Sequence, residues 1–426
     1  MKAELRPTSE MKDSGVQWLG QIPNNWDIIR FKFVHVGANV GMSIDREYWS
    51  DDDADTAFYT AQINPIHVRY NGFPEWKYTS ANDLLLARNA TPYVYLPVIK
   101  AAYTDHIIRV DLKSNFDRRY IRYCLQQSII FDVAEGVSLP TWSVQIWNRQ
   151  IVPFISLKEQ QAIADYLDDR CSKIDEIIAE ATASIEEYKK LKQAVIFEAV
   201  TKGLDKNVTM KGSEILWAKQ IPDSWDVVKV AWLYSVELGK MLDGKRITGV
   251  RLKPYLRNAD VQWNVINTNN LPEMDFTEDD DERYSVKSGD LLVCEGGDIG
   301  KSFIVPEDFP KGIYYQKALH RVRAFDGDID SLKWLRYILY VMSKYSFFNV
   351  LSGEKATIQH LPGVTFNQLR FPMPKQGEKE SIIKFLDNKI PEYDILISEK
   401  QSLIEDLQSY KKSLIYEVVT GKRRVV

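Results

Sequence analysis

The chain contains the same sequence pattern twice. Residues 18–27 and 217–226 are identical at six of ten positions, and the second segment begins 199 residues after the first. A further match joins residues 198–201 (Glu-Ala-Val-Thr) to residues 417–420 (Glu-Val-Val-Thr), at an offset of 219. A repeat of this length is too long for a solenoid. Each copy is therefore expected to be a domain with its connector, the second about 20 residues longer.

Further matches lie between these two ends of each copy. Residues 83–85 correspond to 290–292 at an offset of 207, and residues 120–125 correspond to 334–339 at an offset of 214. Because the offset grows in steps, the additional residues of the second copy are spread over several insertions. The shared residues indicate a common framework. The segments between them differ in length and chemistry, which is typical of two related scaffolds with different surfaces.

Composition favours a chain of two or three globular domains with ordinary cores, since 45% of the 426 residues are hydrophobic and 27% are charged. Cys124, Cys171 and Cys294 are odd in number and far apart, which indicates no disulfide framework and favours a reducing cytoplasm. No apolar run is long enough to span a membrane. The net charge of −4 counts against a free-standing DNA-binding protein, unless the positive surface is local or comes partly from a partner.

Each copy ends in a segment with apolar residues at steps of three and four, which predicts a long amphipathic helix with one narrow seam. The seam positions of the first copy are Ile163, Leu167, Cys171, Ile174, Ile178, Ala181, Ile185, Tyr188, Leu191 and Val195. The positions 219 residues later are Ile382, Leu386, Ile390, Tyr393, Ile397, Lys400, Ile404, Leu407, Tyr410 and Leu414. Nine of these ten are again apolar. Pro391 is expected to kink or restart the second helix, because proline removes a backbone donor.

Such a seam must be covered, and the matching register of the two seams favours pairing of the two helices with each other. The alternative is that each helix docks separately on its own domain. If the pair is antiparallel, an approximate two-fold axis crosses it and places one domain at each end. Duplex DNA has an axis of the same kind, so a protein of this shape could place two readers on two half-sites.

The chain resembles the specificity subunits of type I restriction-modification systems. The resemblance rests on the opening of the first copy, residues 11–26 (MKDSGVQWLGQIPNNW), and on residues 151–161 (IVPFISLKEQQ), where a short strand leads into the long helix. The echo in the second copy, residues 371–378, is weaker, since Lys379 stands where the family usually has glutamine. Together with the duplication, these segments extend the resemblance over essentially the whole chain.

The resemblance implies an α+β fold. Two mixed α/β target recognition domains (1–157 and 204–376) are joined by two long antiparallel spacer helices (158–203 and 377–426), which form a coiled coil with an internal pseudo-two-fold. Each domain would read one half of a bipartite site in double-stranded DNA. Two methyltransferase subunits and the restriction/translocase subunits would dock on the chain. S-adenosylmethionine, ATP and Mg would bind those partners, and the chain itself would hold no cofactor, no metal and no catalytic site.

The sequence was also searched for catalytic motifs. Residues 296–302 (GGDIGKS) follow an apolar run, but a phosphate-binding loop needs glycine at position 295, which is Glu295. Residues 64–67 (NPIH) lack the second proline and the aromatic residue of an adenine methyltransferase loop. The five histidines show no metal or triad spacing. The sequence therefore indicates a binding protein.

In the second copy, residues 240–257 carry six basic residues and a single acid, which suits phosphate contacts. The predicted contacts there are Lys245, Arg246, Arg251 and Lys253. The alternative is a solvated loop. The aligned segment of the first copy, residues 41–59, is acidic instead, so this segment cannot be a phosphate contact that both copies share.

Two loops in each copy are predicted to contact bases. In the first copy, Arg88 and Asn89 follow the apolar run 83–87; arginine can read guanine and asparagine can read adenine in the major groove, and the aligned Glu295 could accept from cytosine. The second loop precedes the strand that leads into each helix. The predicted DNA contacts in these loops are Arg88, Asn89, Thr141, Trp142 and Ser143 in the first copy, and Lys301, Lys355 and Gln359 in the second.

The sequence thus predicts a DNA-specificity subunit with two unlike readers. The rival hypothesis is a coiled-coil scaffold that holds proteins without contacting DNA, and a neighbouring adenine methyltransferase gene would favour the first.

Overall fold

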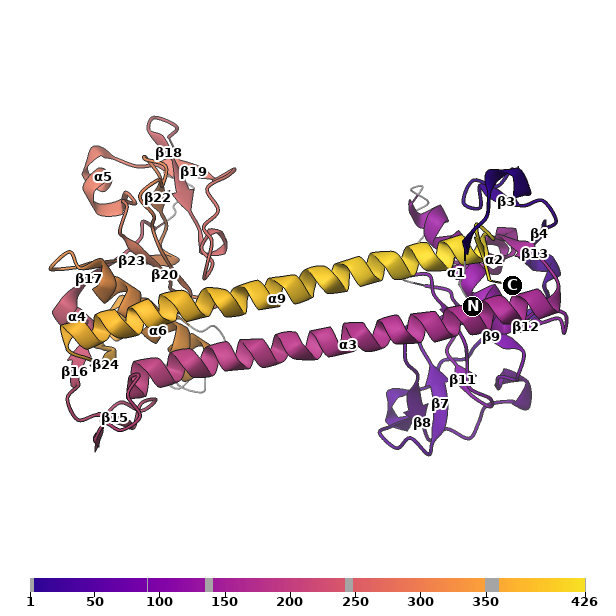
Figure 1. Cartoon of the computed structure of the whole chain (residues 1–426), viewed down its shortest axis with the longest axis horizontal. Helices are drawn as coiled ribbons and strands as arrows, with labels where there is room; N and C mark the ends of the chain where they lie inside the picture. The colour runs from indigo at the N-terminus through magenta and orange to yellow at the C-terminus, as the bar shows by residue number, and fades with distance from the viewer. Residues whose placement is uncertain (1–3, 90, 135–140, 242–247, 349–359, 426) are drawn as a thin grey trace. The chain divides into compact units, whose positions relative to one another are not determined.

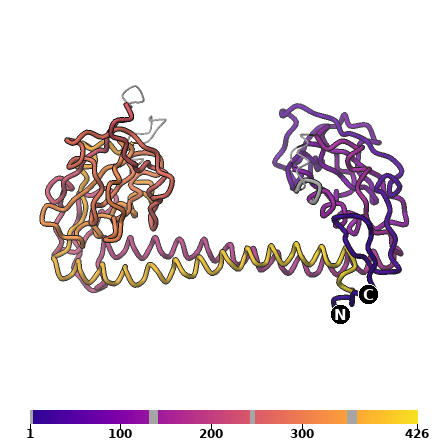
Figure 2. Tube along the Cα trace, turned by 90° about the horizontal axis from the view of Figure 1, so that it is seen from above, coloured from indigo at the N-terminus to yellow at the C-terminus, as the bar shows by residue number. Residues whose placement is uncertain are grey.

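The computed structural model describes residues 4–89, 91–134, 141–241, 248–348 and 360–425. The chain divides into two compact units (Figures 1 and 2). Unit 1 comprises Met1–Thr182 and Ser402–Val426, and unit 2 comprises Ala183–Gln401. Each unit contains part of both long helices, α3 (Leu157–Lys202) and α9 (Gln376–Val419).

Unit 1 is built around a four-stranded antiparallel sheet in the order β10-β9-β12-β5. The strands are β5 (His35–Val40), β9 (Asp83–Ala87), β10 (Val94–Tyr95) and β12 (Ile107–Leu112). All five residues of β9 are buried, because both faces of the sheet are covered. Leu84 and Leu86 face a core that includes α1 (Arg118–Ala134), whereas Leu85 and Ala87 face a core that includes Tyr59 and Tyr103 of the second sheet.

The second sheet of unit 1 has the order β11-β7-β8-β6, and its β11 runs parallel to β7. Three two-stranded pairs complete the unit: β13 with β4, β2 with β3, and β1 with β25. The strands are β1 (Glu4–Leu5), β2 (Met11–Asp13), β3 (Gln21–Pro23), β4 (Asp27–Arg30), β6 (Trp49–Ser50), β7 (Thr56–Tyr59), β8 (Ile66–Val68), β11 (Ala102–Tyr103), β13 (Ile151–Phe154) and β25 (Arg423–Arg424). The short helix α2 (Val144–Arg149) precedes β13.

Unit 2 repeats this topology. Its central sheet has the order β17-β23-β20-β21, its second sheet the order β19-β18-β22 with β22 parallel to β18, and β16 pairs with β24 as β4 pairs with β13. The strands are β14 (Met210–Gly212), β15 (Gln220–Pro222), β16 (Asp226–Lys229), β17 (Tyr234–Leu238), β18 (Leu252–Leu256), β19 (Glu273–Asp275), β20 (Leu291–Cys294), β21 (Ser302–Ile304), β22 (Tyr314–Tyr315), β23 (Leu319–Ala324) and β24 (Arg370–Met373). The helices are α4 (Val230–Leu233), α5 (Glu278–Tyr284), α6 (Ile329–Lys344) and α8 (Gly363–Gln368). The predicted duplication is therefore a duplication of fold.

Helices α3 and α9 run antiparallel within each unit. In unit 1, Asp175 of α3 pairs with Lys411 of α9 at 2.6 Å; in unit 2, Lys192 of α3 pairs with Asp394 of α9 at 2.5 Å. Moving 17 residues forward along α3 thus moves 17 residues back along α9, so the register is the same in both units. The two ion pairs are also related by the repeat, since Asp394 and Lys411 lie 219 residues after Asp175 and Lys192. The predicted antiparallel pairing with an internal pseudo-two-fold is confirmed.

The predicted helix-pairing residues Ile163, Leu167, Ile174, Ile178, Ile185, Ile382, Leu386, Ile397, Ile404 and Leu407 are all buried or half-buried. Two other seam positions were wrong, since Leu191 and Tyr410 are exposed and the neighbouring Lys192 and Lys411 face the partner helix instead. The predicted restart at Pro391 was also wrong, because α9 continues through it. Pro391 and Asp387 are both exposed, so water can bond the Asp387 carbonyl that the proline leaves without a donor.

Candidate nucleic-acid interface

The two loops predicted to read DNA meet in unit 1. Arg88 and Asn89 follow β9, and Thr141–Ser143 precede α2. The Trp142 amide donates to the Arg88 carbonyl at 2.6 Å, and Asn89 and Thr141 form an isolated β-bridge. Segments about fifty positions apart in sequence are therefore held side by side by main-chain bonds, an arrangement that the sequence did not reveal.

Unit 2 contains the equivalent junction. The Leu361 amide donates to the Glu295 carbonyl at 2.7 Å, and Gly296 and His360 form the β-bridge. Glu295 and Gly296 lie 207 residues after Arg88 and Asn89, and His360 lies 219 residues after Thr141. We call these two places the unit 1 junction (Arg88, Asn89, Thr141) and the unit 2 junction (Glu295, Gly296, His360).

The side chains at the two junctions differ in chemistry. In unit 1, the Asn89 amide nitrogen lies 2.5 Å from His106 Nδ1, and Arg88 Nη1 donates to the Asp105 carbonyl at 3.2 Å. In unit 2, the exposed His360 imidazole lies 3.1 Å from the Glu295 carboxylate. The first junction is rich in donors, whereas the second contains a carboxylate and no side chain at Gly296. Equivalent main-chain geometry thus supports two different patterns of hydrogen-bonding groups.

The framework behind each junction repeats an ion pair. Asp83 lies 3.7 Å from Arg109 in unit 1, and the equivalent Asp290 lies 2.5 Å from Arg323 in unit 2. Burial raises the pKa of the Asp83 carboxyl. Each pair links the central strand to its neighbour at the end opposite the junction, because Asp83 and Asp290 precede or start β9 and β20. The two junctions are thus positioned by the same strand pairing.

Two predicted contacts are corrected by their burial. Trp142 is only 3% exposed and belongs to the core of unit 1, and Lys301 is only 8% exposed. DNA contacts need surface side chains, so neither can reach a duplex in this conformation. Sequence alone could not separate a tryptophan that supports a loop from one that presents a ring. Ser143 accepts a hydrogen bond from the Ile146 amide at 3.4 Å and therefore acts as the N-cap of α2.

The basic cluster of the second copy is less positive than its sequence indicates. Arg251 forms a bidentate pair with Asp281, with N–O distances of 2.8 and 2.6 Å, and this hydrogen bonding lowers the pKa of the Asp281 carboxyl. Lys240 pairs with Asp280 of the same helix, α5, at 2.5 Å. These acids lie some thirty residues downstream of the cluster, which is why a count along the sequence missed them. Lys253 is half-buried and lowers the pKa of Asp281 through its charge.

The remaining predicted contacts Lys245, Arg246, Lys355 and Gln359 lie outside the described residues. A nearby carboxylate is organised by main-chain donors: the amides of Arg251, Gly249 and Thr248 bond Asp275 and lower its pKa to about 2. Arg88, Asn89 and Thr141 stay predictions, now placed at one junction.

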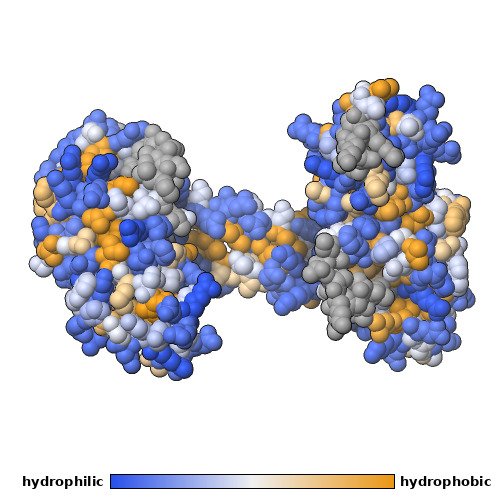
Figure 3. Space-filling model, turned by 180° about the vertical axis from the view of Figure 1, so that it is seen from behind, coloured by the Kyte–Doolittle hydropathy of each residue, from blue (hydrophilic) through white to orange (hydrophobic). Residues whose placement is uncertain are grey.

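The described residues contain no group of three or more histidine, cysteine, aspartate or glutamate side chains arranged to hold a metal ion. Within the same residues, no helix has the length and apolar character needed to cross a membrane. In the face drawn in Figure 3, hydrophilic residues dominate and hydrophobic ones form small separate patches.

Comparison with known proteins agrees with this architecture. Residues 222–405 match the family model of the type I restriction modification DNA specificity domain. The chain is 24% identical over 438 aligned positions to the type I restriction enzyme MjaVIII specificity subunit of Methanocaldococcus jannaschii, covering 95% of this chain and 94% of that protein. It is also 24% identical over 257 positions to the EcoBI specificity subunit of Escherichia coli, covering 56% and 53% of the two chains.

A solved structure that addresses complex assembly and conformational transition of a type I restriction-modification system contains a chain with the same fold. The TM-score is 0.70 at 11% sequence identity, and the match covers 94% of this chain and 99% of the other. The sequence matches, the fold and the internal duplication together show that this chain is a member of the family of type I restriction-modification specificity subunits, which are non-catalytic components of their complexes.

Proposed function

We propose that this chain reads an asymmetric bipartite site in double-stranded DNA, one half with each unit. The observation that carries the proposal is the pair of equivalent junctions with unlike side chains. Arg88 can read guanine and Asn89 adenine, whereas Glu295 can accept a hydrogen bond from cytosine N4. A protein with two identical readers would favour a symmetric site. Unlike groups on one framework favour two different half-sites.

The gap between the half-sites is proposed to depend on helices α3 and α9. Their antiparallel register is marked by the Asp175–Lys411 and Lys192–Asp394 pairs. A fixed register between two long helices provides a fixed separation between the elements attached to them. The proposed role of the helices is therefore to set spacing, while the junctions read bases.

The proposed partners are two methyltransferase subunits and the restriction/translocase subunits, in the cytoplasm. S-adenosylmethionine, ATP and Mg are proposed to bind those partners. The net charge of −4 supports a shared DNA interface, because the partners would supply positive surface that this chain lacks.

The test is to express the chain with its methyltransferase subunit in a host without adenine methylation, and then to map methylated adenines across the genome by long-read sequencing. We expect one motif with two different half-sites and a gap of constant length. Omission of the chain should abolish the motif. A methylated motif without a gap, or one that persists without the chain, would contradict the proposal.

A further inference from the structure

Each unit has a pocket where its first long helix after the central sheet meets α3 and α9. The unit 1 pocket has a volume of about 520 Å³ and is lined by Arg122, Tyr123, Asp168 and Asp175 among others. The unit 2 pocket, about 480 Å³, is lined by the repeat equivalents Arg336, Tyr337, Asp387 and Asp394. The tyrosine–aspartate bonds behind them are also repeated, at 2.8 Å in unit 1 and 2.7 Å in unit 2. The two pockets are therefore two copies of one site.

In unit 2, the chain itself occupies one side of this site. Arg336 Nη2 donates to the Trp263 carbonyl and, at 3.2 Å, to the Asn264 side-chain oxygen. The Asn264 amide in turn donates to Asp394 at 3.3 Å, and the Trp263 ring packs edge-on against Tyr340 with ring centroids 5.0 Å apart. Burial lowers the pKa of Arg336. A tryptophan–asparagine step thus satisfies the guanidinium with a carbonyl and an amide.

In unit 1, the equivalent arginine has no such cover. Arg122 is half-buried, its guanidinium lies 4.9 Å from the Tyr123 ring centroid, and it forms no hydrogen bond or ion pair with the residues that the structure describes. Residues 61–64, which occupy the corresponding place between β7 and β8, are exposed. The equivalent of Tyr340 is Gln126, which accepts from the Val94 amide and donates to the Pro92 carbonyl. The site is therefore complete in unit 2 and open in unit 1.

We propose that the Arg122 pocket of unit 1 is a docking site for a peptide segment of the methyltransferase subunit, which presents a main-chain carbonyl and a side-chain amide as Trp263–Asn264 does in unit 2. This inference rests on the proposed function. Lining carboxylates Asp168, Asp175 and Glu176 outnumber the cations Arg122 and Lys411, so a neutral acceptor fits better than a phosphate. A second copy of this chain is a poor occupant, because its Trp263–Asn264 step is already bound to its own Arg336.

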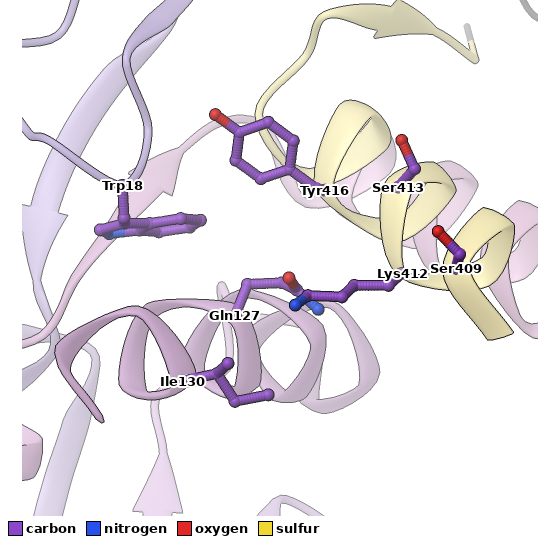
Figure 4. Close-up of a pocket in the computed structure, with 7 residues that line it drawn as sticks. All are labelled: Trp18, Gln127, Ile130, Ser409, Lys412, Ser413 and Tyr416. Atoms are coloured by element: carbon purple, nitrogen blue, oxygen red, sulfur yellow. The ribbon is translucent and has the colours of Figure 1, made fainter. Parts of the chain in front are cut away.

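A neighbouring pocket extends the docking surface. Gln127 also lines a cavity of about 390 Å³ with Trp18, Ile130 and Tyr416, and Figure 4 shows Gln127 and Ile130 on α1 facing the α9 residues across this space. A segment that leaves the Arg122 pocket along α1 therefore meets an apolar wall. The proposed occupant is a segment that pairs polar main-chain groups with an adjacent apolar side chain.

The test compares binding of the methyltransferase subunit to the full chain and to Arg122→Ala by biolayer interferometry. We expect at least tenfold weaker binding, because a hydrogen-bonded charge is lost. Arg170→Ala is the matched control, since Arg170 is an exposed arginine on α3 that does not line the pocket; it should bind within twofold of the wild type. Arg122→Lys should recover part of the loss.

A second variant guards against misfolding. Ala179 lines the pocket at an exposed position, so Ala179→Trp should fill the pocket without disturbing the core, and Ile177→Trp provides an exposed control on another face of α3. Binding within twofold by both Arg122→Ala and Ala179→Trp would overturn this inference while leaving the proposed function intact. Loss of DNA affinity without loss of methyltransferase binding would also overturn it. A wild-type chain that binds no methyltransferase would instead reject the proposed function itself.

Discussion

Units 1 and 2 share a framework but differ in how the chain covers it. In unit 2, Trp217 contacts Phe347 and Phe197 contacts Tyr345, with ring centroids 6.2 and 5.0 Å apart. The equivalents of Trp217 and Phe197 in unit 1 are Trp18 and Tyr416, which line a pocket. The Arg122 and Arg336 sites differ in the same way. Duplication therefore preserved the residues that hold the strands and helices together, whereas the residues that cover the surfaces diverged.

The helix ion pairs offer the sharpest break in this equivalence, because repeated residues sit in different surroundings. The side chains of Lys192 and Asp394 are 10% and 37% exposed, against 28% and 57% for Lys411 and Asp175. Asp394→Ala should leave a nearly buried lysine unpaired and lower the local unfolding free energy by about 2–4 kcal/mol. Asp175→Ala should cost less than about 1 kcal/mol.

Amide hydrogen exchange measures this difference locally, through the protection of the α9 turns around residues 394 and 411. Equal losses of protection at the two sites would mean that burial does not distinguish the two pairs.

The ion pairs also show what the sequence could and could not predict. Apolar periodicity placed most of the seam, but it favoured Leu191 and Tyr410 over Lys192 and Lys411. A lysine can bury its aliphatic stem and pair its ammonium, so it reads as polar while it occupies a seam position. An offset of 219 between Asp175 and Asp394 was a usable signal, since chemically identical residues recur at equivalent positions.

The candidate sites were less predictable than the framework. Repeat matches such as 83–85 with 290–292 mark the buried strands β9 and β20, whose pairing is set by local apolar runs. The junctions depend on main-chain bonds between segments about fifty residues apart, which no local pattern encodes. The basic cluster was misjudged because its counter-charges, Asp280 and Asp281, come from a distant helix. Tertiary contacts, rather than local propensity, decide all of these features.

Exchange of reading chemistry is the second test of the comparison. Arg88→Ala and Glu295→Ala each remove a side chain from one junction, so each should relax base preference in a different half of the methylated motif. A lost base contact reduces discrimination by about 1–3 kcal/mol, or roughly 5- to 150-fold. The measurement is the methylated motif recovered by genome-wide mapping, with the unaltered half serving as the internal control. If both variants relax the same half, or neither half, the junctions are not the readers.

The smallest expected difference concerns pH and the equivalent histidines His106 and His320. His320 is buried, its Nε2 lies 2.7 Å from the Leu361 carbonyl, and burial lowers its pKa below the ordinary value of 6.5. The unfolded chain therefore binds this proton more readily than the folded chain. The stabilisation from neutral His320 is complete above about pH 6.5 and is lost as the pH falls below that value. The carboxylate of Glu295 opposes the effect of burial and keeps the loss small.

Protection factors of the β23 amides, corrected for intrinsic exchange rates, should accordingly decrease between pH 7.5 and pH 5.5 in the wild-type chain. In His320→Gln the decrease should be smaller, because glutamine has no proton to gain and can still donate to the Leu361 carbonyl. His106→Gln serves as the control, since His106 is exposed and its loss should leave β23 unchanged. An identical pH dependence in wild type and His320→Gln would show that the buried imidazole does not couple protonation to the stability of unit 2. In that case the unit 2 junction, which His320 supports through Leu361, would be as insensitive to mild acid as its counterpart in unit 1.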